Sequence, residues 1–141
     1  MAANVESLKG VEMFQGVPDS TLERLERMAR ERNYEPGDEI MSQDMQGVGV
    51  FVLLDGEAEF VRDGQTLGTL GPGSFFGEMA LLDHYRRSGT IRAKQPSRCL
   101  AIPRSDFVAE LKASNDLCFN MLVHMTHRVR DLDERLAAAG S

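Results

Sequence analysis

The chain has 141 residues, enough for one domain with an ordinary buried core. Its 22 acidic residues outnumber its 16 lysines and arginines, which gives a formal net charge of −6 at pH 7. Nucleic-acid backbones are bound by clustered Lys and Arg, so this balance argues against a nucleic-acid-binding surface. Any anionic ligand must therefore be met by a local basic site.

The two cysteines, Cys99 and Cys118, lack metal-ligand spacing and do not suggest a disulfide framework. No stretch is apolar over the roughly eighteen residues that a membrane span requires. The N-terminus also lacks a basic segment followed by an apolar run. The sequence therefore predicts a cytoplasmic protein that does not associate with a membrane.

Residues 1–31 are predicted to form an N-terminal helical segment that packs on the rest of the chain. Apolar residues in 1–18 indicate a short helix or helical turns. A second helix is expected over 19–30, because Ser20 and Glu23 have the spacing of a capping box. Its inward face would carry Leu22, Leu25, Met28 and Ala29.

The segment 32–103 has the turn punctuation of an antiparallel β fold. The run 48–54 is continuously apolar, as in a buried strand, and Asp-Gly pairs at 55–56 and 63–64 are hairpin signals. Other strands are expected at residues 58–62, 66–70, 90–94 and 98–102. About eight short strands at this spacing favour a β-sandwich or jelly roll over a parallel sheet. The fold class is therefore mainly β with flanking helices (α+β): a jelly roll with an N-terminal helix pair and a long C-terminal helix.

Residues 104–141 are predicted to form the C-terminal helices. Ser105 is expected to cap a helix over 106–113. The last helix has apolar residues at alternating intervals of four and three, which is the seam of a coiled coil. The seam residues are Cys118, Leu122, Met125, Val129, Leu132 and Leu136. In that register Arg128 and Asp133 would form an interchain pair in a parallel dimer. We expect a homodimer, and the alternative is a helix packed on its own barrel.

The stretch 77–92, GEMALLDHYRRSGTIR, has the features of a site for a small anion. Gly77 allows a tight turn, and the apolar residues after Glu78 can form one helical turn whose unpaired N–H groups attract phosphate. The two arginines and the serine at 86–88 add further donors. Glu78 would repel an anion unless it accepts a hydrogen bond from a hydroxyl of the same ligand. A phosphate next to a sugar hydroxyl satisfies that requirement.

The runs 76–82 and 87–91 resemble the phosphate-binding cassette of the cyclic nucleotide-binding domain family. That family includes the regulatory subunits of cyclic AMP-dependent protein kinase and bacterial catabolite activator proteins. The resemblance extends over roughly residues 10–136, with the cassette at 76–91. It implies a sensor that binds cAMP or cGMP, needs no cofactor, and relays occupancy through its C-terminal helix to a dimer interface or an effector protein.

The resemblance also implies roles for individual residues. Glu78 would accept a hydrogen bond from the ribose 2′-hydroxyl, and the backbone N–H groups of Met79 and Ala80 would face the phosphate. Arg87 would pair with the exocyclic oxygens, with Ser88 as a further donor. The implied ligand-binding residues are Gly77, Glu78, Met79, Ala80, Arg87 and Ser88. Weaker candidates for the pocket are Phe60, Leu67, Leu70, Gly89 and Thr90.

Several residues depart from the family pattern. Arg86 stands where many members have proline, and Gly89 where alanine is usual, which predicts a more mobile loop. Ser88 leaves the choice between cAMP and cGMP open, with a mild preference for cAMP. In bacterial members the final helix offers polar side chains to the base. The aligned positions here are Leu132 and Asp133, and Leu132 has no side-chain donor or acceptor.

Each of these assignments has a structural alternative. Arg87 could simply neutralise Glu78, Ser88 could be a turn residue, and the apolar candidates could be plain core. The rival function is accordingly a ligand-free structural or dimerisation module of the same fold.

Other kinds of chemistry are not favoured. His124 and His127 could share a metal ion, but no third ligand has suitable spacing, so no metal is expected. The chain offers no nucleophile, base and orienting group for catalysis, and a cupin-type enzyme would require a histidine cluster. The chain also stops near where bacterial regulators begin a helix-turn-helix. We therefore expect no enzyme and no nucleic-acid binding through this chain alone.

Overall fold

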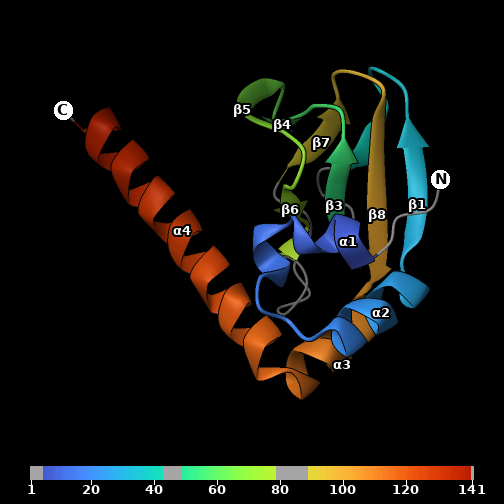
Figure 1. Cartoon of the computed structure of the whole chain (residues 1–141). Helices are drawn as coiled ribbons and strands as arrows, with labels where there is room; N and C mark the ends of the chain where they lie inside the picture. Colours follow the sequence, from blue (N-terminus) through green and yellow to red (C-terminus); the bar gives the residue numbers. More distant parts are fainter. Residues whose placement is uncertain (1–4, 43–48, 79–88, 141) are drawn as a thin grey trace.

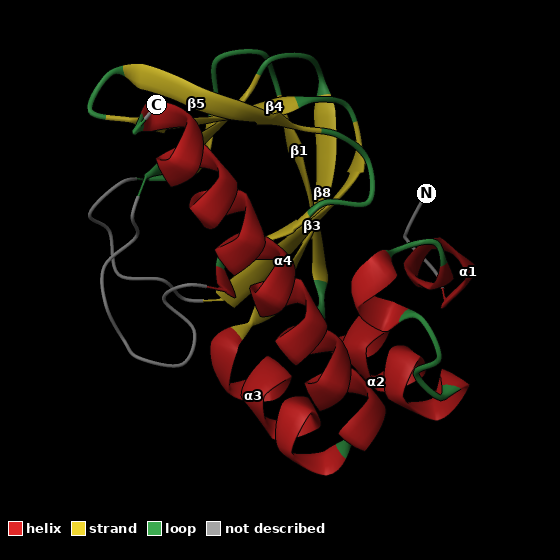
Figure 2. Ribbon diagram, turned by 90° about the vertical axis from the view of Figure 1, so that its left-hand side faces the viewer, coloured by secondary structure: helices red, strands yellow, loops and turns green. Residues whose placement is uncertain are grey.

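The computed structural model describes residues 5–42, 49–78 and 89–140. In this part of the chain, two four-stranded antiparallel sheets form a jelly-roll sandwich. Helices α2 and α3 lie at one end of it, and the long helix α4 starts there and extends away (Figures 1 and 2). The predicted fold class is therefore confirmed. The helices are α1 (Val5–Lys9), the 3-10 helix η1 (Glu12–Phe14), α2 (Asp19–Met28), α3 (Arg104–Ala113) and α4 (Asn115–Ala139).

Each sheet combines strands that are far apart in the sequence. The first has the order β1 (Arg30–Tyr34), β8 (Ser97–Pro103), β3 (Gly49–Asp55) and β6 (Phe75–Phe76). The second has the order β2 (Glu39–Met41), β7 (Thr90–Ala93), β4 (Ala58–Arg62) and β5 (Gln65–Leu70). Among the described strands, neighbours are antiparallel throughout, and only β4 and β5 form a simple hairpin of consecutive strands.

Strand β3 lies between the two hydrophobic clusters of the core. Val50 and Val52 belong to the cluster between the first sheet and the helices. Phe51 and Leu53 belong to the cluster between the two sheets. Successive side chains of a strand point to opposite faces, so a strand covered on both sides is apolar at every position. This arrangement explains the continuous apolar run, and the predicted buried strand is confirmed over the part that the structure describes, Gly49–Asp55.

The predicted caps of α2 and α3 are wrong. Ser20 and Ser105 lie inside their helices, which begin at Asp19 and Arg104, and the preceding residues, Pro18 and Pro103, make no side-chain cap bond. Proline takes the cap position because its fixed φ and extended ψ lead into a helix without the need for a side-chain acceptor. The serine that does cap a helix is the one before α4: Ser114 accepts a hydrogen bond from a backbone N–H, with a donor–acceptor distance of 3.2 Å.

Helix α2 ends earlier than the predicted boundary at residue 30. The helix ends at Met28, and β1 begins at Arg30, which pairs with Ala101 of β8. The charged residues from Arg30 onward therefore pair with β8 as a strand and do not extend the helix. Two short strands, β2 and β6, are also not evident from the sequence, because three and two residues are too few to show alternation.

Helix α4 packs on the body mainly through its first half. Leu117 and Met121 are buried, and the Asn120 Nδ2 group donates to the backbone oxygens of Met13 and Gln15 at 2.8 Å each. From Thr126 onward the described residues of the helix are exposed, and Figure 1 shows the helix running away from the sandwich. Although α4 is 25 residues long, it is too polar to cross a membrane, and the other helices in the described part of the chain also cannot span one.

Candidate functional site

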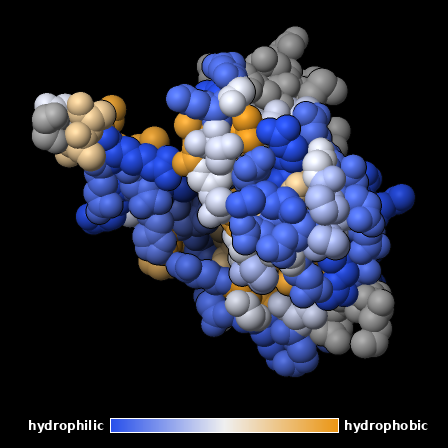
Figure 3. Space-filling model, turned by 90° about the horizontal axis from the view of Figure 1, so that it is seen from above, coloured by the Kyte–Doolittle hydropathy of each residue, from blue (hydrophilic) through white to orange (hydrophobic). Residues whose placement is uncertain are grey.

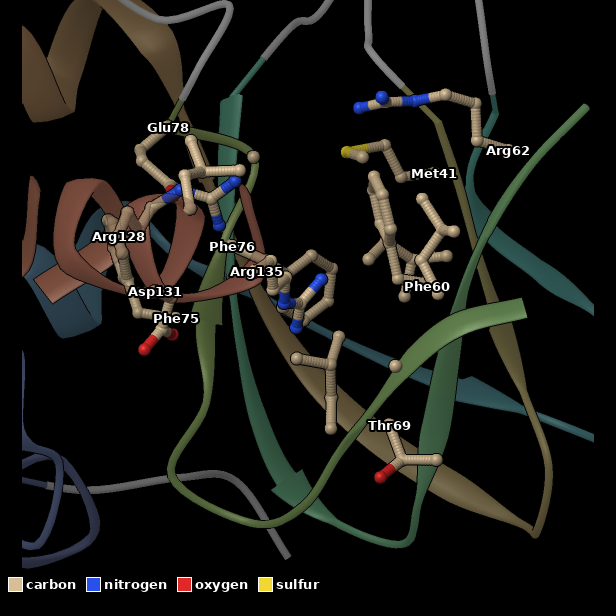
Figure 4. Close-up of a pocket in the computed structure, with 16 residues that line it drawn as sticks. Met41, Phe60, Arg62, Thr69, Phe75, Phe76, Glu78, Arg128, Asp131 and Arg135 are labelled. Atoms are coloured by element: carbon tan, nitrogen blue, oxygen red, sulfur yellow. The ribbon is translucent and has the colours of Figure 1, made fainter. Parts of the chain in front are cut away.

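A cavity of about 430 Å³ lies between the second sheet and α4 (Figure 4). Strands β2, β4, β5 and β7 supply much of its apolar wall, and Phe75 and Phe76 of β6 also line it. The apolar side chains from the second sheet are Met41, Phe60, Leu67, Leu70 and Ile91. Polar groups enter mainly from the segment after β6 and from α4. The cavity is thus a sheet-lined hollow closed on one side by a helix.

The chain enters the cavity through the aromatic pair of β6. Phe76 stacks on Phe51 with ring centroids 5.3 Å apart, and Phe75 packs on Phe107 at 5.5 Å. Gly77 then takes a φ of +94°, which a residue with a side chain adopts only with strain. The turn at Gly77 comes directly after the packed rings of Phe75 and Phe76. The residue after the turn, Glu78, lies at the wall of the cavity.

Glu78 is a buried carboxylate held by two groups of α4. The His124 Nε2 atom lies 3.0 Å from Glu78 Oε1, in hydrogen-bond contact, and the Arg128 Nε atom lies 3.3 Å from the same oxygen. The Glu78 side chain is only 2% exposed. Burial by itself would raise the pKa of Glu78, but the hydrogen bond from His124 and the charge of Arg128 together hold the pKa below its ordinary value. Glu78 is therefore ionised at neutral pH.

The two partners of Glu78 are presented by one face of α4. His124 and Arg128 are four residues apart, so their side chains lie one above the other on the helix. His124 also packs edge-on against Phe75, with ring centroids 5.4 Å apart. His127 points elsewhere and lies 3.6 Å from Glu12. The two histidines therefore do not converge, and among the described residues no group of three metal-ligating side chains occurs.

The same face of α4 continues along the cavity beyond Arg128. Asp131, Leu132 and Arg135 follow it at intervals of three, four and seven residues, and all three line the cavity. Of the two positions aligned with the base-contacting residues of bacterial members, Leu132 lines the cavity, and Asp133 is not among the lining residues. Because Arg128 contacts Glu78 at the cavity wall, the helical repeat places Asp131 and Arg135 on the same side of α4.

Gly89 has a packing role on the other side of the cavity. A Cβ atom at this position would lie 2.6 Å from Cζ of Phe60 and 2.8 Å from the carbonyl oxygen of Val61. The missing side chain thus leaves room for the Phe60 ring at the cavity wall, and the Arg62 guanidinium lies 5.7 Å from the centroid of that ring. The larger mobility expected from Gly89 stays a prediction.

The cavity is locally cationic although the chain is acidic. Arg62, Arg128 and Arg135 line it, against the two carboxylates Glu78 and Asp131. The chain as a whole has a formal net charge of −6. The lining of the cavity thus has a small excess of positive charge in a chain that is negative overall.

Comparison with known proteins decides the family. Residues 31–114 match the family model of the cyclic nucleotide-binding domain. The chain belongs to the cyclic nucleotide-binding domain family. It is 30% identical over 134 residues to the cyclic AMP receptor protein of Thermus thermophilus, an alignment that covers 92% of this chain and 62% of that protein.

Two further similarities agree with this assignment. Over 95 residues the chain is 28% identical to the cAMP-dependent protein kinase regulatory subunit of Yarrowia lipolytica, with 67% of this chain and 25% of that protein covered. The crystal structure of the Thermus thermophilus catabolite activator protein superposes with a TM-score of 0.81 at 28% identity, over 92% of this chain and 63% of the other. The chain thus spans less than two thirds of the length of each of these relatives.

The residues implied by the cyclic nucleotide-binding family fall into three groups. Gly77, Glu78, Phe60, Leu67 and Leu70 line the cavity. Gly89 is buried beside Phe60 and Thr90 is half-buried in β7, and neither is among the lining residues that the structure describes. Met79, Ala80, Arg86, Arg87 and Ser88 lie outside the described residues, so their roles stay predictions. The sequence does not indicate the cavity positions of Met41, Arg62, Thr69, Asp131 and Arg135.

Proposed function

We propose that this chain is a cyclic nucleotide sensor that binds cAMP or cGMP in the cavity and relays occupancy through α4. The observation that carries the proposal is Glu78, a buried, ionised carboxylate at the wall of a cavity that three arginines also line. A ligand with only a phosphate would be repelled by it. A ligand with a phosphate and a neighbouring sugar hydroxyl satisfies both the cations and the carboxylate.

The proposed binding mode places each part of the nucleotide against different groups. The ribose 2′-hydroxyl donates to Glu78, and the apolar wall from β4 and β5 accommodates the sugar and base. The cyclic phosphate is held by Arg87, by the Ser88 hydroxyl, and by the backbone N–H groups of the turn that opens at Gly77, with Met79 and Ala80 the first donors. An arginine fork matches two phosphate oxygens at once, which makes Arg87 the principal anchor.

The proposed relay depends on Glu78 contacting both the ligand and helix α4. The carboxylate is the group that the ribose contacts in the proposal, and it also contacts His124 and Arg128 of α4. A new hydrogen bond to Glu78 competes with, or reorients, these two contacts. Because α4 is otherwise held to the body mainly by residues in its first half, such a change alters the packing of the helix. Ligand binding thereby shifts the population of α4 positions.

The output of the sensor is proposed to be a parallel homodimer or an effector protein that binds α4. The apolar residues Leu122, Val129, Leu132 and Leu136 are each more than half exposed. Figure 3 shows apolar side chains along the part of the helix that projects from the body. Met125, in contrast, packs against the core. A second copy would cover the exposed stripe, although an interchain pair between Arg128 and Asp133 requires Arg128 to leave Glu78.

The rival proposal is a ligand-free structural or dimerisation module. It accounts for the exposed stripe on α4 and for the contacts of Glu78 with His124 and Arg128, but it gives no reason for a cavity that Arg62 and Arg135 also line. In our proposal the protein acts in the cytoplasm, catalyses no turnover of its ligand, and binds neither membranes nor nucleic acid through this chain.

Thermal unfolding separates the two proposals. Ligand at about 100 times its dissociation constant stabilises the folded state by about 2.7 kcal/mol, which raises the melting temperature by several degrees. We expect that shift with cAMP or cGMP, and none with the matched linear 5′-monophosphates, which lack the cyclic phosphate. Arg87→Ala should abolish the shift without loss of folded structure. The absence of a shift with both cyclic nucleotides would favour the ligand-free module.

A further inference from the structure

We propose that Arg135 sets the base preference of the cavity and favours guanine over adenine, so that cGMP binds more tightly than cAMP. This inference rests on the proposed function and deepens it, because a sensor for cAMP or cGMP leaves the base open. It also runs against the mild preference for cAMP that Ser88 suggests.

The position of Arg135 places it at the base end of the cavity. Arg128 marks the sugar end, because it contacts Glu78. Arg135 lies seven residues further along the same face of α4, which is roughly 10 Å at 1.5 Å per residue. That separation is comparable to the span from a ribose hydroxyl to the far edge of the attached purine. Figure 4 shows the Arg135 guanidinium reaching from α4 into the space that faces Phe60.

Arg135 is also the arginine of this cavity whose donors are unused among the described residues. Arg128 is engaged by Glu78, and Arg62 lies over the Phe60 ring. No hydrogen bond or ion pair joins Arg135 to any residue in 5–42, 49–78 or 89–140, and Asp131, one turn before it, is not within ion-pair distance. An arginine that lines a cavity in this way is available to a ligand.

The donor pattern of arginine distinguishes the two purines. A guanidinium offers two parallel N–H donors, and guanine presents two adjacent acceptors, O6 and N7. Adenine presents N7 beside the N6 amino group, which is a donor, so one of the two N–H groups faces another N–H group. The Phe60 ring across the cavity can stack on either base and does not discriminate. Arg135 therefore supplies the selective contact.

Calorimetric titration with three cyclic nucleotides tests this assignment. cGMP and its inosine analogue cIMP share O6 and N7, whereas cIMP lacks the 2-amino group of guanine. We expect the wild-type chain to bind cGMP and cIMP about tenfold more tightly than cAMP, a ratio within the range by which a bidentate contact discriminates between bases. Arg135→Ala should bring the three affinities together. Arg135→Lys should do the same, because it keeps the charge but loses the fork.

Arg130→Ala is the matched control, because Arg130 lies on the same helix and is exposed but does not line the cavity. It should leave all three affinities unchanged. The inference is overturned if the wild-type chain prefers cAMP, or if Arg135→Ala weakens the three ligands equally, which would indicate stacking on the base. It is also overturned if cIMP binds as weakly as cAMP. Failure of the wild-type chain to bind any of the three would instead overturn the proposed function itself.

Discussion

His124 and Glu78 are 46 residues apart in the sequence, yet the imidazole Nε2 lies 3.0 Å from the carboxylate Oε1. The contact joins the segment after β6 to the middle of α4. It is largely protected from water, since the Glu78 side chain is 2% exposed and the His124 side chain 25%. The helix is therefore attached to the site at the residue that we propose the ribose contacts.

The Glu78 contacts should make stability depend on pH. Because the folded-state pKa of Glu78 is lower than the reference value of 4.5, its contribution is present above about pH 4.5 and is lost as the pH falls through the lower folded value. Glu78→Gln should lower the free energy of unfolding by about 1 to 3 kcal/mol at pH 7, the usual cost of losing a buried charged hydrogen bond. Denaturant titration of both proteins from pH 7 to pH 3 measures the difference. A difference that stays constant over this range would contradict the assignment.

Gly89→Ala should destabilise the fold. The new Cβ atom would lie 2.6 Å from the Phe60 ring and 2.8 Å from a backbone oxygen, so both the ring and the chain must move. Overpacking of this kind costs about 1 to 3 kcal/mol, measurable by thermal or denaturant unfolding. Gly68→Ala is the control, because Gly68 pairs with Phe60 on the neighbouring strand but a Cβ atom there would have nothing within 4 Å. Equal stabilities of the two variants would show that Phe60 relaxes freely.

Val129→Asp should convert the proposed dimer to a monomer. Val129 is 56% exposed on α4 and does not belong to the hydrophobic core, so the change removes an intermolecular contact and leaves the fold intact. Analytical ultracentrifugation gives the mass of each variant, and circular dichroism checks the fold. Arg130→Asp, which adds an acidic residue at the next position, should remain dimeric. A wild-type chain that sediments as a monomer at all accessible concentrations would refute the dimer.

Ligand binding should change the hydrogen exchange of residues 115–136. In the proposed relay, the response passes from Glu78 to α4 through His124 and Arg128. The double variant His124→Ala and Arg128→Ala should therefore show a much smaller change on ligand binding than the wild-type chain, whereas Arg130→Ala should respond as the wild type does. Identical exchange of these residues with and without saturating ligand would rule the relay out.

Features that rest on local pattern are predictable from the sequence. The run 48–54 indicates a strand covered on both faces, and the spacing around Glu78 places a carboxylate where the cavity is found. Both signals come from neighbouring residues. Ser20 and Ser105 show how local signals also mislead, since a proline directly before each helix takes the cap position instead.

The partners of Glu78 could not be predicted from the sequence, because they depend on how α4 packs on the sandwich. The spacing of His124 suggests only a metal ligand, and that of Arg128 only an interchain pair with Asp133. Arg135 carries no signal at all, because a charged residue late in a helix is ordinarily a solvated one. Arg135 is identified as a cavity residue only from the structure. The contact between Arg128 and Glu78 determines which face of α4 lines the cavity, and Arg135 lies on that face.

Isothermal titration calorimetry of the wild-type chain with cAMP and with cGMP, repeated on Arg87→Ala, tests the proposed sensor most directly. We predict saturable binding at one site per chain for at least one of the two nucleotides. We also predict that Arg87→Ala, while still folded, loses that binding. A folded wild-type chain that binds neither nucleotide, or an Arg87→Ala variant that binds as tightly as the wild type, would contradict the proposal.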